Sequence, residues 1–250
     1  MKSDDSTFEG VTTVFVDLDD TLWDFGANSR LALRHTYDHF GIARWQPDYN
    51  QFATTYETRN AELWHAYHHG LVTRDFLLAE RFRHALVQSG CTAHATALGA
   101  AMNECYLTHL ATLPALVPGA RELLEHLHRH GYGVHVLSNG FAGVQQRKLA
   151  SAGIGHLVDS LVLSDDCGIT KPQRGIFDHA LAVTGATAGS AVMIGDDPDT
   201  DIAGAHNAGW RTIYFNAKQR PAMPGTADAE IIHLSQATLL LQGKPGRQAT

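Results

Sequence analysis

Cysteine, lysine and long apolar runs are all scarce in this sequence of 250 residues. The three cysteines, Cys91, Cys105 and Cys167, are odd in number and unrelated in spacing, which argues against a disulfide framework and favours a reducing compartment. The formal net charge is -7 and no run of Lys or Arg forms a basic stripe, so we expect no nucleic acid polymer as partner. Residues 1–10 lack the apolar stretch of a secretory signal, and no segment is long enough to span a membrane. These absences predict a cytoplasmic globular protein without a membrane partner.

Five short apolar segments rich in β-branched residues predict a parallel sheet. Some are apolar at every position, as strands are when helices cover both faces of a sheet. Helical segments alternate with the later strands, which predicts an α/β fold with a doubly wound, Rossmann-like parallel sheet. The predicted strands are residues 11–16, 134–137, 161–163, 191–194 and 211–215. The predicted helices of this part are residues 121–130, 141–152, 176–183 and 199–208.

Residues 23–113 interrupt this alternation. They contain no convincing strand, and stretches such as 76–87 and 97–110 have helical periodicity. We therefore expect an α-helical cap domain at residues 23–113, inserted into an α/β core domain that residues 1–22 and 114–250 form.

Acidic side chains follow the first predicted strand directly, in the sequence Asp17-Leu18-Asp19-Asp20-Thr21. Ligands of open α/β sheets bind at the carboxyl ends of the strands. Alternate side chains of an extended segment point the same way, so Asp17 and Asp19 can share one site. One such carboxylate can act as nucleophile or metal ligand and the other as general acid. Without other motifs in the chain, the Asp-x-Asp pattern alone would instead indicate a solvent-exposed acidic turn.

Polar residues also follow the second and third of these strands. Ser138, Asn139 and Gly140 open a helix, where a hydroxyl, backbone N–H groups and the helix dipole can bind a phosphate, although Ser-Asn-Gly is also common turn chemistry. Lys171, followed by Pro172, stands beyond the third predicted strand and is one of only five lysines in the sequence. Most lysines are simply exposed, so this position alone does not establish a function.

Carboxylates cluster after the fourth strand of this series. Asp196, Asp197 and Asp201 lie within six residues, and magnesium prefers oxygen ligands of this kind. The alternative role of Asp199 or Thr200 is purely structural, as the N-cap of the next helix.

The ordered set Asp-x-Asp, Ser-Asn-Gly, Lys-Pro and Gly-Asp-Asp, each after a separate strand, resembles the haloacid dehalogenase superfamily. The likeness covers nearly the whole chain, with the helical insert in the place of that superfamily's first type of cap. It implies an Mg2+-dependent phosphomonoester hydrolase with an aspartyl-phosphate intermediate. It also implies a division of roles: Asp17 as nucleophile, Asp19 as general acid and base, Lys171 as cationic clamp, Ser138, Asn139 and Gly140 as phosphate cradle, Asp17, Asp19 and Asp196 as metal ligands, and Asp197 and Asp201 as candidates to contact the metal or its waters.

Single residues separate the branches of this superfamily. Haloacid dehalogenases do not need the second aspartate, which is present here as Asp19, so dehalogenation is disfavoured. Phosphonoacetaldehyde hydrolases need a Schiff-base lysine from the cap, and residues 23–113 contain no lysine. Phosphomonoester hydrolysis remains, ahead of a phosphomutase and of a non-catalytic binding protein on the same fold.

Finer features resemble the pyrimidine 5'-nucleotidase branch, so a nucleoside monophosphate is the expected small phosphorylated partner. They include Trp64, Tyr67 and Arg74 in the insert and Phe141 after the cradle. An aromatic ring can stack on a base, and an arginine can meet its polar edge or a phosphate. Each residue also has an ordinary alternative, core packing or a surface cation. A sugar phosphate or phosphoglycolate is the alternative substrate.

Overall fold

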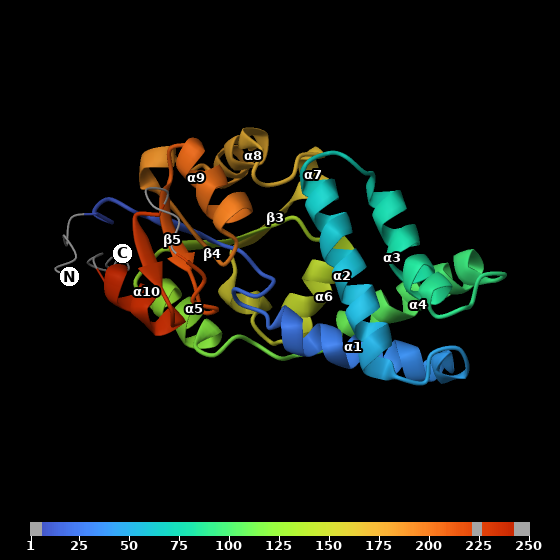
Figure 1. Cartoon of the computed structure of the whole chain (residues 1–250). Helices are drawn as coiled ribbons and strands as arrows, with labels where there is room; N and C mark the ends of the chain where they lie inside the picture. The colour runs from blue at the N-terminus through green and yellow to red at the C-terminus, as the bar shows by residue number, and fades with distance from the viewer. Residues whose placement is uncertain (1–6, 222–226, 243–250) are drawn as a thin grey trace. The chain divides into compact units, whose positions relative to one another are not determined.

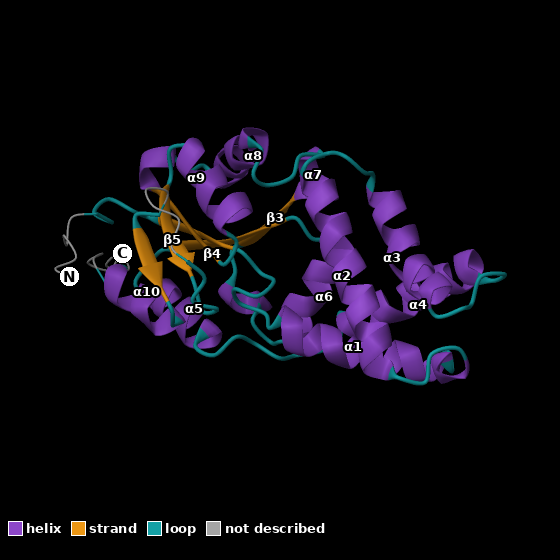
Figure 2. Cartoon of the chain, viewed as in Figure 1, coloured by secondary structure: helices purple, strands orange, loops and turns teal. Residues whose placement is uncertain are grey.

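The computed structural model describes residues 7–221 and 227–242, and it divides the chain into two compact units. The first unit contains residues 1–25 and 114–250, and the second contains residues 26–113. All strands of the described residues belong to the first unit, whereas the second is helical (Figure 2).

A six-stranded sheet forms the centre of the first unit (Figure 1). The strand order is β3-β2-β1-β4-β5-β6, and every neighbouring pair is parallel. The direction of winding reverses between β1 and β4, and open α/β sheets bind ligands at such a switch point. The strands are β1 (Thr13–Val16), β2 (Gly133–Ser138), β3 (Ser160–Leu163), β4 (Ala191–Gly195), β5 (Arg211–Phe215) and β6 (Ala229–Ile231).

The sheet confirms the predicted α/β fold. β1 and β4 are buried at every position, which explains why their sequences are apolar throughout. The five predicted strands are all present. β6 is an additional strand that the sequence did not reveal, because its three residues, Ala-Glu-Ile, are too few and too polar to form a pattern.

Helices cover both faces of the sheet. α5 and α10 pack on one face, and α8 and α9 lie on the other (Figure 1). Beneath α8, the Trp210 ring lies 4.5 Å from the Phe15 ring and 5.3 Å from the Phe177 ring, measured between centroids. The helices of this unit are α5 (Ala120–Arg129), α6 (Ala142–Ser151), α7 (Ser164–Cys167), α8 (Arg174–Thr184), α9 (Gly204–Asn207) and α10 (Leu234–Leu240).

The segment after β4 differs from the α-helix predicted for residues 199–208. It forms a π-helix, η4 (Pro198–Ala203), before α9. The N–H of Ile202 bonds to the carbonyl of Asp197, five residues earlier, at 3.3 Å. π-Helices are rare, but those that occur are often at functional sites. The segment is too short for its apolar residues to show a period that distinguishes a π-helix from an α-helix.

The second unit is built from four α-helices. α2 and α3 begin at side-chain caps, since Asp48 accepts the Asn50 N–H at 2.9 Å and Thr73 accepts the Phe76 N–H at 3.2 Å. The helices are α1 (Phe25–His39), whose first residue belongs to the first unit, α2 (Tyr49–His68), α3 (Arg74–Gln88) and α4 (Ala95–Leu110), with a 3-10 turn at Ile42–Arg44. Across the described residues of both units, no helix combines the length and apolar character that a membrane crossing requires.

The aromatic cluster under α8 generates a stability prediction. Phe177 is fully buried, so Phe177→Ala is expected to lower the free energy of unfolding by about 3–5 kcal/mol through lost burial and an unfilled cavity. Val183 lies on the same helix with 56% of its surface exposed, and Val183→Ala should change stability by less than about 0.5 kcal/mol. Urea unfolding of both variants checks this. Equal losses would contradict the assigned core.

Candidate active site

The chain turns sharply after β1 and presents two carboxylates at the end of the strand. Asp20 adopts a left-handed φ of 62°, and the Trp23 N–H bonds back to the carbonyl of Leu18 at 2.8 Å. Leu18 is fully buried. Asp17 is buried as well, whereas the side chain of Asp19 is 31% exposed. The two carboxylates predicted from the sequence therefore differ in environment.

Lys171 lies buried beside Asp17, with 2% of its side chain exposed. Its Nζ donates hydrogen bonds to Asp17 Oδ1 at 2.6 Å, to Asp201 Oδ1 at 2.6 Å and to the Leu137 carbonyl at 2.8 Å, which uses all three ammonium hydrogens. The Asn139 side chain holds the backbone of this residue, since Oδ1 accepts the Lys171 N–H at 2.8 Å and Nδ2 donates to the Lys171 carbonyl at 3.0 Å. Hydrogen bonds therefore hold both the ammonium group and the backbone of Lys171.

The neighbouring carboxylates carry more negative charge than Lys171 balances. Burial raises the pKa of Asp17 well above its usual range, and the charges of Asp201 and Asp196 add to this while Lys171 opposes it. Burial, followed by the charges of Asp201 and Asp20, raises the pKa of Asp196 to about 7. Burial lowers the pKa of Lys171, but the charges of Asp17 and Asp201 outweigh it and raise that pKa, so the ammonium stays charged.

A divalent cation fits this donor set. Asp17, Asp196 and Asp201 each offer a carboxylate oxygen, and these three oxygens lie within 4.8 Å of one another. Among the described residues, no other group of three His, Cys, Asp or Glu side chains converges in this way. The donors are all oxygens, which suits a hard cation such as magnesium, and a bound cation would relieve the surplus negative charge. The sequence predicts Asp17 and Asp196 as ligands and leaves open whether Asp197 or Asp201 contacts the metal or its waters, and of these two only Asp201 belongs to the converging group.

The phosphate cradle predicted from the sequence lies at the end of β2. The Ser138 hydroxyl accepts the Gly140 N–H at 3.1 Å and a hydrogen from Gln145 Nε2 at 2.7 Å, which leaves its own O–H to donate to a ligand. Glycine at position 140 leaves room for Gln145, because a Cβ there would lie 2.1 Å from Gln145 Nε2 and displace that side chain. α6 begins directly afterwards, and the N-terminus of a helix favours a bound anion.

Two side chains of α6 that were not among the predicted site residues bind Asp19. Gln145 Nε2 also donates to Asp19 Oδ2 at 2.8 Å, and Lys148 Nζ donates to Asp19 Oδ1 at 2.6 Å. Their sequence signal is a glutamine and a lysine three residues apart, the first of them five residues after Gly140. Such a pair lies on one face of a helix but is common on solvated faces, so the pattern alone did not indicate a site.

The acidic residues after β4 have different roles. Asp197 caps η4 by accepting the Asp199 N–H at 2.9 Å and the Thr200 N–H at 2.8 Å, the duty that the sequence analysis had considered for Asp199 or Thr200. Asp201 points back to the strand end, where a Cβ on Gly195 would lie 2.2 Å from its Oδ2. Glycine at the end of β4 therefore admits the Asp201 carboxylate.

The candidate specificity residues belong to both units. Trp64 and Tyr67 lie in α2, with ring centroids 5.7 Å apart in an edge-to-face arrangement, and Arg74 is the first residue of α3. Phe141 precedes α6 in the first unit and occupies its N-cap position. Trp64 and Tyr67 therefore present one joint aromatic element within their unit.

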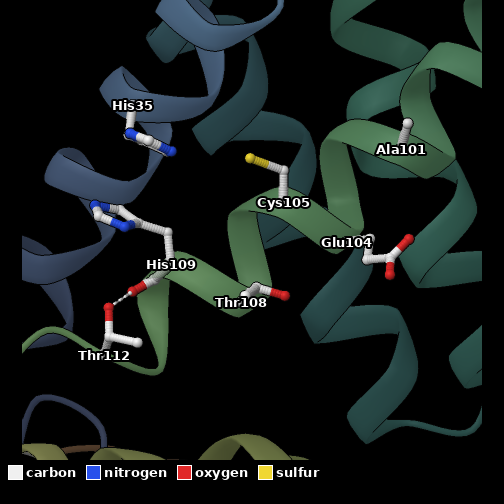
Figure 3. Close-up of a pocket in the computed structure, with 7 residues that line it drawn as sticks. All are labelled: His35, Ala101, Glu104, Cys105, Thr108, His109 and Thr112. Carbon is white, nitrogen blue, oxygen red and sulfur yellow. Dashed lines mark hydrogen bonds between the residues drawn. The ribbon is translucent and has the colours of Figure 1, made fainter.

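The second unit also contains a pocket of its own. It opens between α1 and α4, where the rings of His35 and His109 stack with centroids 4.1 Å apart (Figure 3). Cys105 points into the same space one turn before His109 (Figure 3). Its lining includes no residue that the sequence singled out as functional, and its polar atoms do not converge as the three carboxylates do.

Removing one carboxylate of the acidic group has a predicted effect on stability. The pKa of Asp196 is raised from 3.8 to about 7, so the folded, metal-free protein loses stability as pH rises between these values. Asp196→Asn should therefore raise the melting temperature in EDTA at about pH 8, with a much smaller gain at about pH 4. Mg2+ should raise the melting temperature of the parent protein but not of this variant.

Thermal unfolding with and without Mg2+ at both pH values measures these shifts. Asp199→Asn is the matched control, since Asp199 is exposed in the same segment, and it should keep the parental response. A lower melting temperature for Asp196→Asn than for the parent at about pH 8 in EDTA would refute the surplus of negative charge.

Comparison with known proteins identifies the family. The haloacid dehalogenase-like hydrolase family matches residues 11–209. The chain is 30% identical over 213 residues to the HAD-hydrolase YfnB of Bacillus subtilis, covering 85% of this chain and 87% of that protein. The crystal structure of magnesium-bound YfnB superposes with a TM-score of 0.83 at 28% identity, over 93% of this chain and 99% of the other.

Two further relatives are enzymes that act on phosphate esters. The pyrimidine 5'-nucleotidase YjjG of Escherichia coli is 30% identical over 215 residues, which cover 86% of this chain and 90% of that protein. A ribulose-1,5-bisphosphate 5-phosphatase of Halopiger xanaduensis is 28% identical over 218 residues, 87% of this chain and 90% of its own length. With its family match spanning most of the sequence, the chain belongs to the haloacid dehalogenase-like hydrolases, as its motifs had indicated.

Proposed function

We propose that this hydrolase cleaves phosphomonoesters through an aspartyl-phosphate on Asp17, depends on Mg2+ and prefers pyrimidine nucleoside 5'-monophosphates. The observation that carries the proposal is the buried contact of Lys171 Nζ with both Asp17 and Asp201 at 2.6 Å. It fixes a carboxylate nucleophile in a site that favours positive charge and lies beside a phosphate cradle. Residues 26–113, the helical unit, would act as the cap.

In the first step, an Asp17 oxygen attacks phosphorus and the bond from phosphorus to the leaving oxygen breaks. Asp19 supplies the proton that the departing alkoxide takes up. The Ser138 hydroxyl and the N–H groups around Gly140 hold the phosphoryl oxygens. Lys171 keeps Asp17 oriented and offsets the negative charge that gathers there.

In the second step, Asp19, now a carboxylate, takes a proton from water as the water oxygen attacks the same phosphorus. The bond between Asp17 and phosphorus breaks, which releases inorganic phosphate and restores both carboxyl groups. Mg2+ held by Asp17 and Asp196, with the Asp19 carbonyl or Asp201 as a further oxygen donor, would neutralise phosphoryl charge and lessen its repulsion by the carboxylates.

The substrate preference rests on the aromatic pair Trp64 and Tyr67 with Arg74, and on the position of Phe141 directly after the cradle. Each can meet a nucleobase or its sugar by stacking or by a polar contact. The similarity to YjjG, a pyrimidine 5'-nucleotidase, supports this substrate class. A sugar phosphate is the second candidate, favoured by the similarity to a ribulose-1,5-bisphosphate phosphatase.

Phosphate release from a panel of monophosphates with Mg2+ tests the proposal. Pyrimidine nucleoside 5'-monophosphates should give higher kcat/KM than purine nucleotides, ribose 5-phosphate, glyceraldehyde 3-phosphate or phosphoglycolate. Trp64→Ala should lower kcat/KM for nucleotides by about ten- to a hundredfold through lost stacking, and that for p-nitrophenyl phosphate far less. Trp45→Ala is the control, because Trp45 lies in the same unit between α1 and α2.

Sugar phosphates that exceed every nucleotide would overturn the substrate class and leave the phosphatase chemistry standing. No turnover of any phosphate ester with Mg2+ would overturn the activity itself. Activation by Zn2+ but not Mg2+ would contradict the assigned metal.

A further inference from the structure

Lys148 is a buried lysine to which neither the family motifs nor the proposed mechanism assigns a role. It lies in α6, and 3% of its side chain is exposed. Its ammonium lies 4.4 Å from the centre of the Trp23 ring and 5.6 Å from that of Phe25. Lysines are rarely buried without a partner, because removing an ammonium from water costs several kcal/mol.

Its partner is the carboxylate proposed as general acid. Lys148 Nζ lies 2.6 Å from Asp19 Oδ1, and no other carboxylate of the described chain forms an ion pair with it. The two aromatic rings close the apolar side of the pair and favour the cation through their faces. The buried charge is therefore directed at Asp19, although the two residues are far apart in the sequence.

Gln145 completes the contact from the same face of α6. It is fully buried, and its Nε2 hydrogens go to Asp19 Oδ2 at 2.8 Å and to Ser138 Oγ at 2.7 Å. Its Oε1 is buried without a hydrogen-bond partner in the described structure. One helix thus binds both oxygens of Asp19 and ties them to the cradle serine.

On the basis of the proposed function, we infer that Lys148 and Gln145 are positioning residues that hold the Asp19 carboxylate where it accepts the proton of the attacking water. In the second half-reaction Asp19 must be a carboxylate aimed at that water. Lys148 and Gln145 each bind one Asp19 oxygen, so the two α6 contacts restrict the rotation of the side chain. Proton transfer is sensitive to such placement. Loss of Lys148 should therefore slow the hydrolysis of the aspartyl-phosphate more than its formation from an activated ester.

The test is pre-steady-state kinetics of Lys148→Met with p-nitrophenyl phosphate, whose leaving group needs no proton. The variant should release a burst of about one p-nitrophenol per enzyme and then turn over with kcat lowered about ten- to a hundredfold. Its kcat/KM, which reports formation of the phosphoenzyme, should stay within about threefold of the parent. With an alkyl phosphate, kcat/KM should also fall, because Asp19 must then protonate the leaving oxygen.

Arg147→Met is the matched control, since Arg147 is the exposed basic neighbour on α6, and its burst and kcat should equal those of the parent. Gln145→Met removes the second contact without leaving a buried charge unpaired, and it should give the same burst as Lys148→Met. It carries the test if Lys148→Met does not fold.

Three results separate the possibilities. A parent enzyme that does not hydrolyse p-nitrophenyl phosphate with Mg2+ refutes the proposed function, and the inference with it. An active parent whose folded Lys148 and Gln145 variants lose kcat and kcat/KM equally, without a burst, refutes the positioning role alone. Faster turnover of Lys148→Met would show instead that the contact restrains Asp19.

Discussion

The contact of one ammonium with two carboxylates is the constraint on which the rest of the site depends. Lys171 brings Asp17 from β1 and Asp201 from η4 together in a buried place, where either carboxylate alone would be costly. Its third hydrogen goes to the Leu137 carbonyl, so β2 is included as well. Three segments of the sheet edge are thereby fixed around one positive charge.

The single positive charge of Lys171 does not neutralise all the carboxylates around it. Asp196 adds a further acidic group, and the raised pKa values of this cluster express the remaining negative charge. A bound cation would offset this charge. This explains why a fold would keep buried carboxylates at the switch point of its sheet, and it connects the energetics of the apo protein to its chemistry.

The positions of the main candidate site residues could be predicted from the sequence because each stands at or beyond the carboxyl end of an apolar strand. Asp17, Ser138, Lys171 and Asp196 needed only the rule that parallel strands present their carboxyl ends at one edge. The strand positions were predictable for the same reason, since burial on both faces imposes an apolar sequence. Residues that do not stand near the end of a strand could not be predicted in this way. Lys148 lies inside a helix with polar neighbours, and only the packing of α6 against the turn after β1 brings it to Asp19.

Two other features depended on local hydrogen bonding that no apolar pattern encodes. In η4 the Ile202 N–H bonds to the Asp197 carbonyl and the Asp197 side chain caps the turn, while Asp201 accepts a hydrogen bond from Lys171. The roles of two side-chain amides were not predictable either. Asn139 was predicted as part of the phosphate cradle, but its hydrogen bonds to the Lys171 backbone, like those of Gln145 to Asp19, depend on tertiary contacts.

The most direct test of the proposed mechanism is to trap the aspartyl-phosphate on Asp17. The Mg2+-loaded protein would be mixed with saturating p-nitrophenyl phosphate, quenched with borohydride during turnover, and digested for peptide mass spectrometry. Because borohydride reduces an acyl phosphate to an alcohol, the account predicts homoserine at position 17, only when substrate is present. Continued phosphate release with position 17 unmodified, or with the reduction at another carboxylate, would contradict the assignment of Asp17 as the nucleophile.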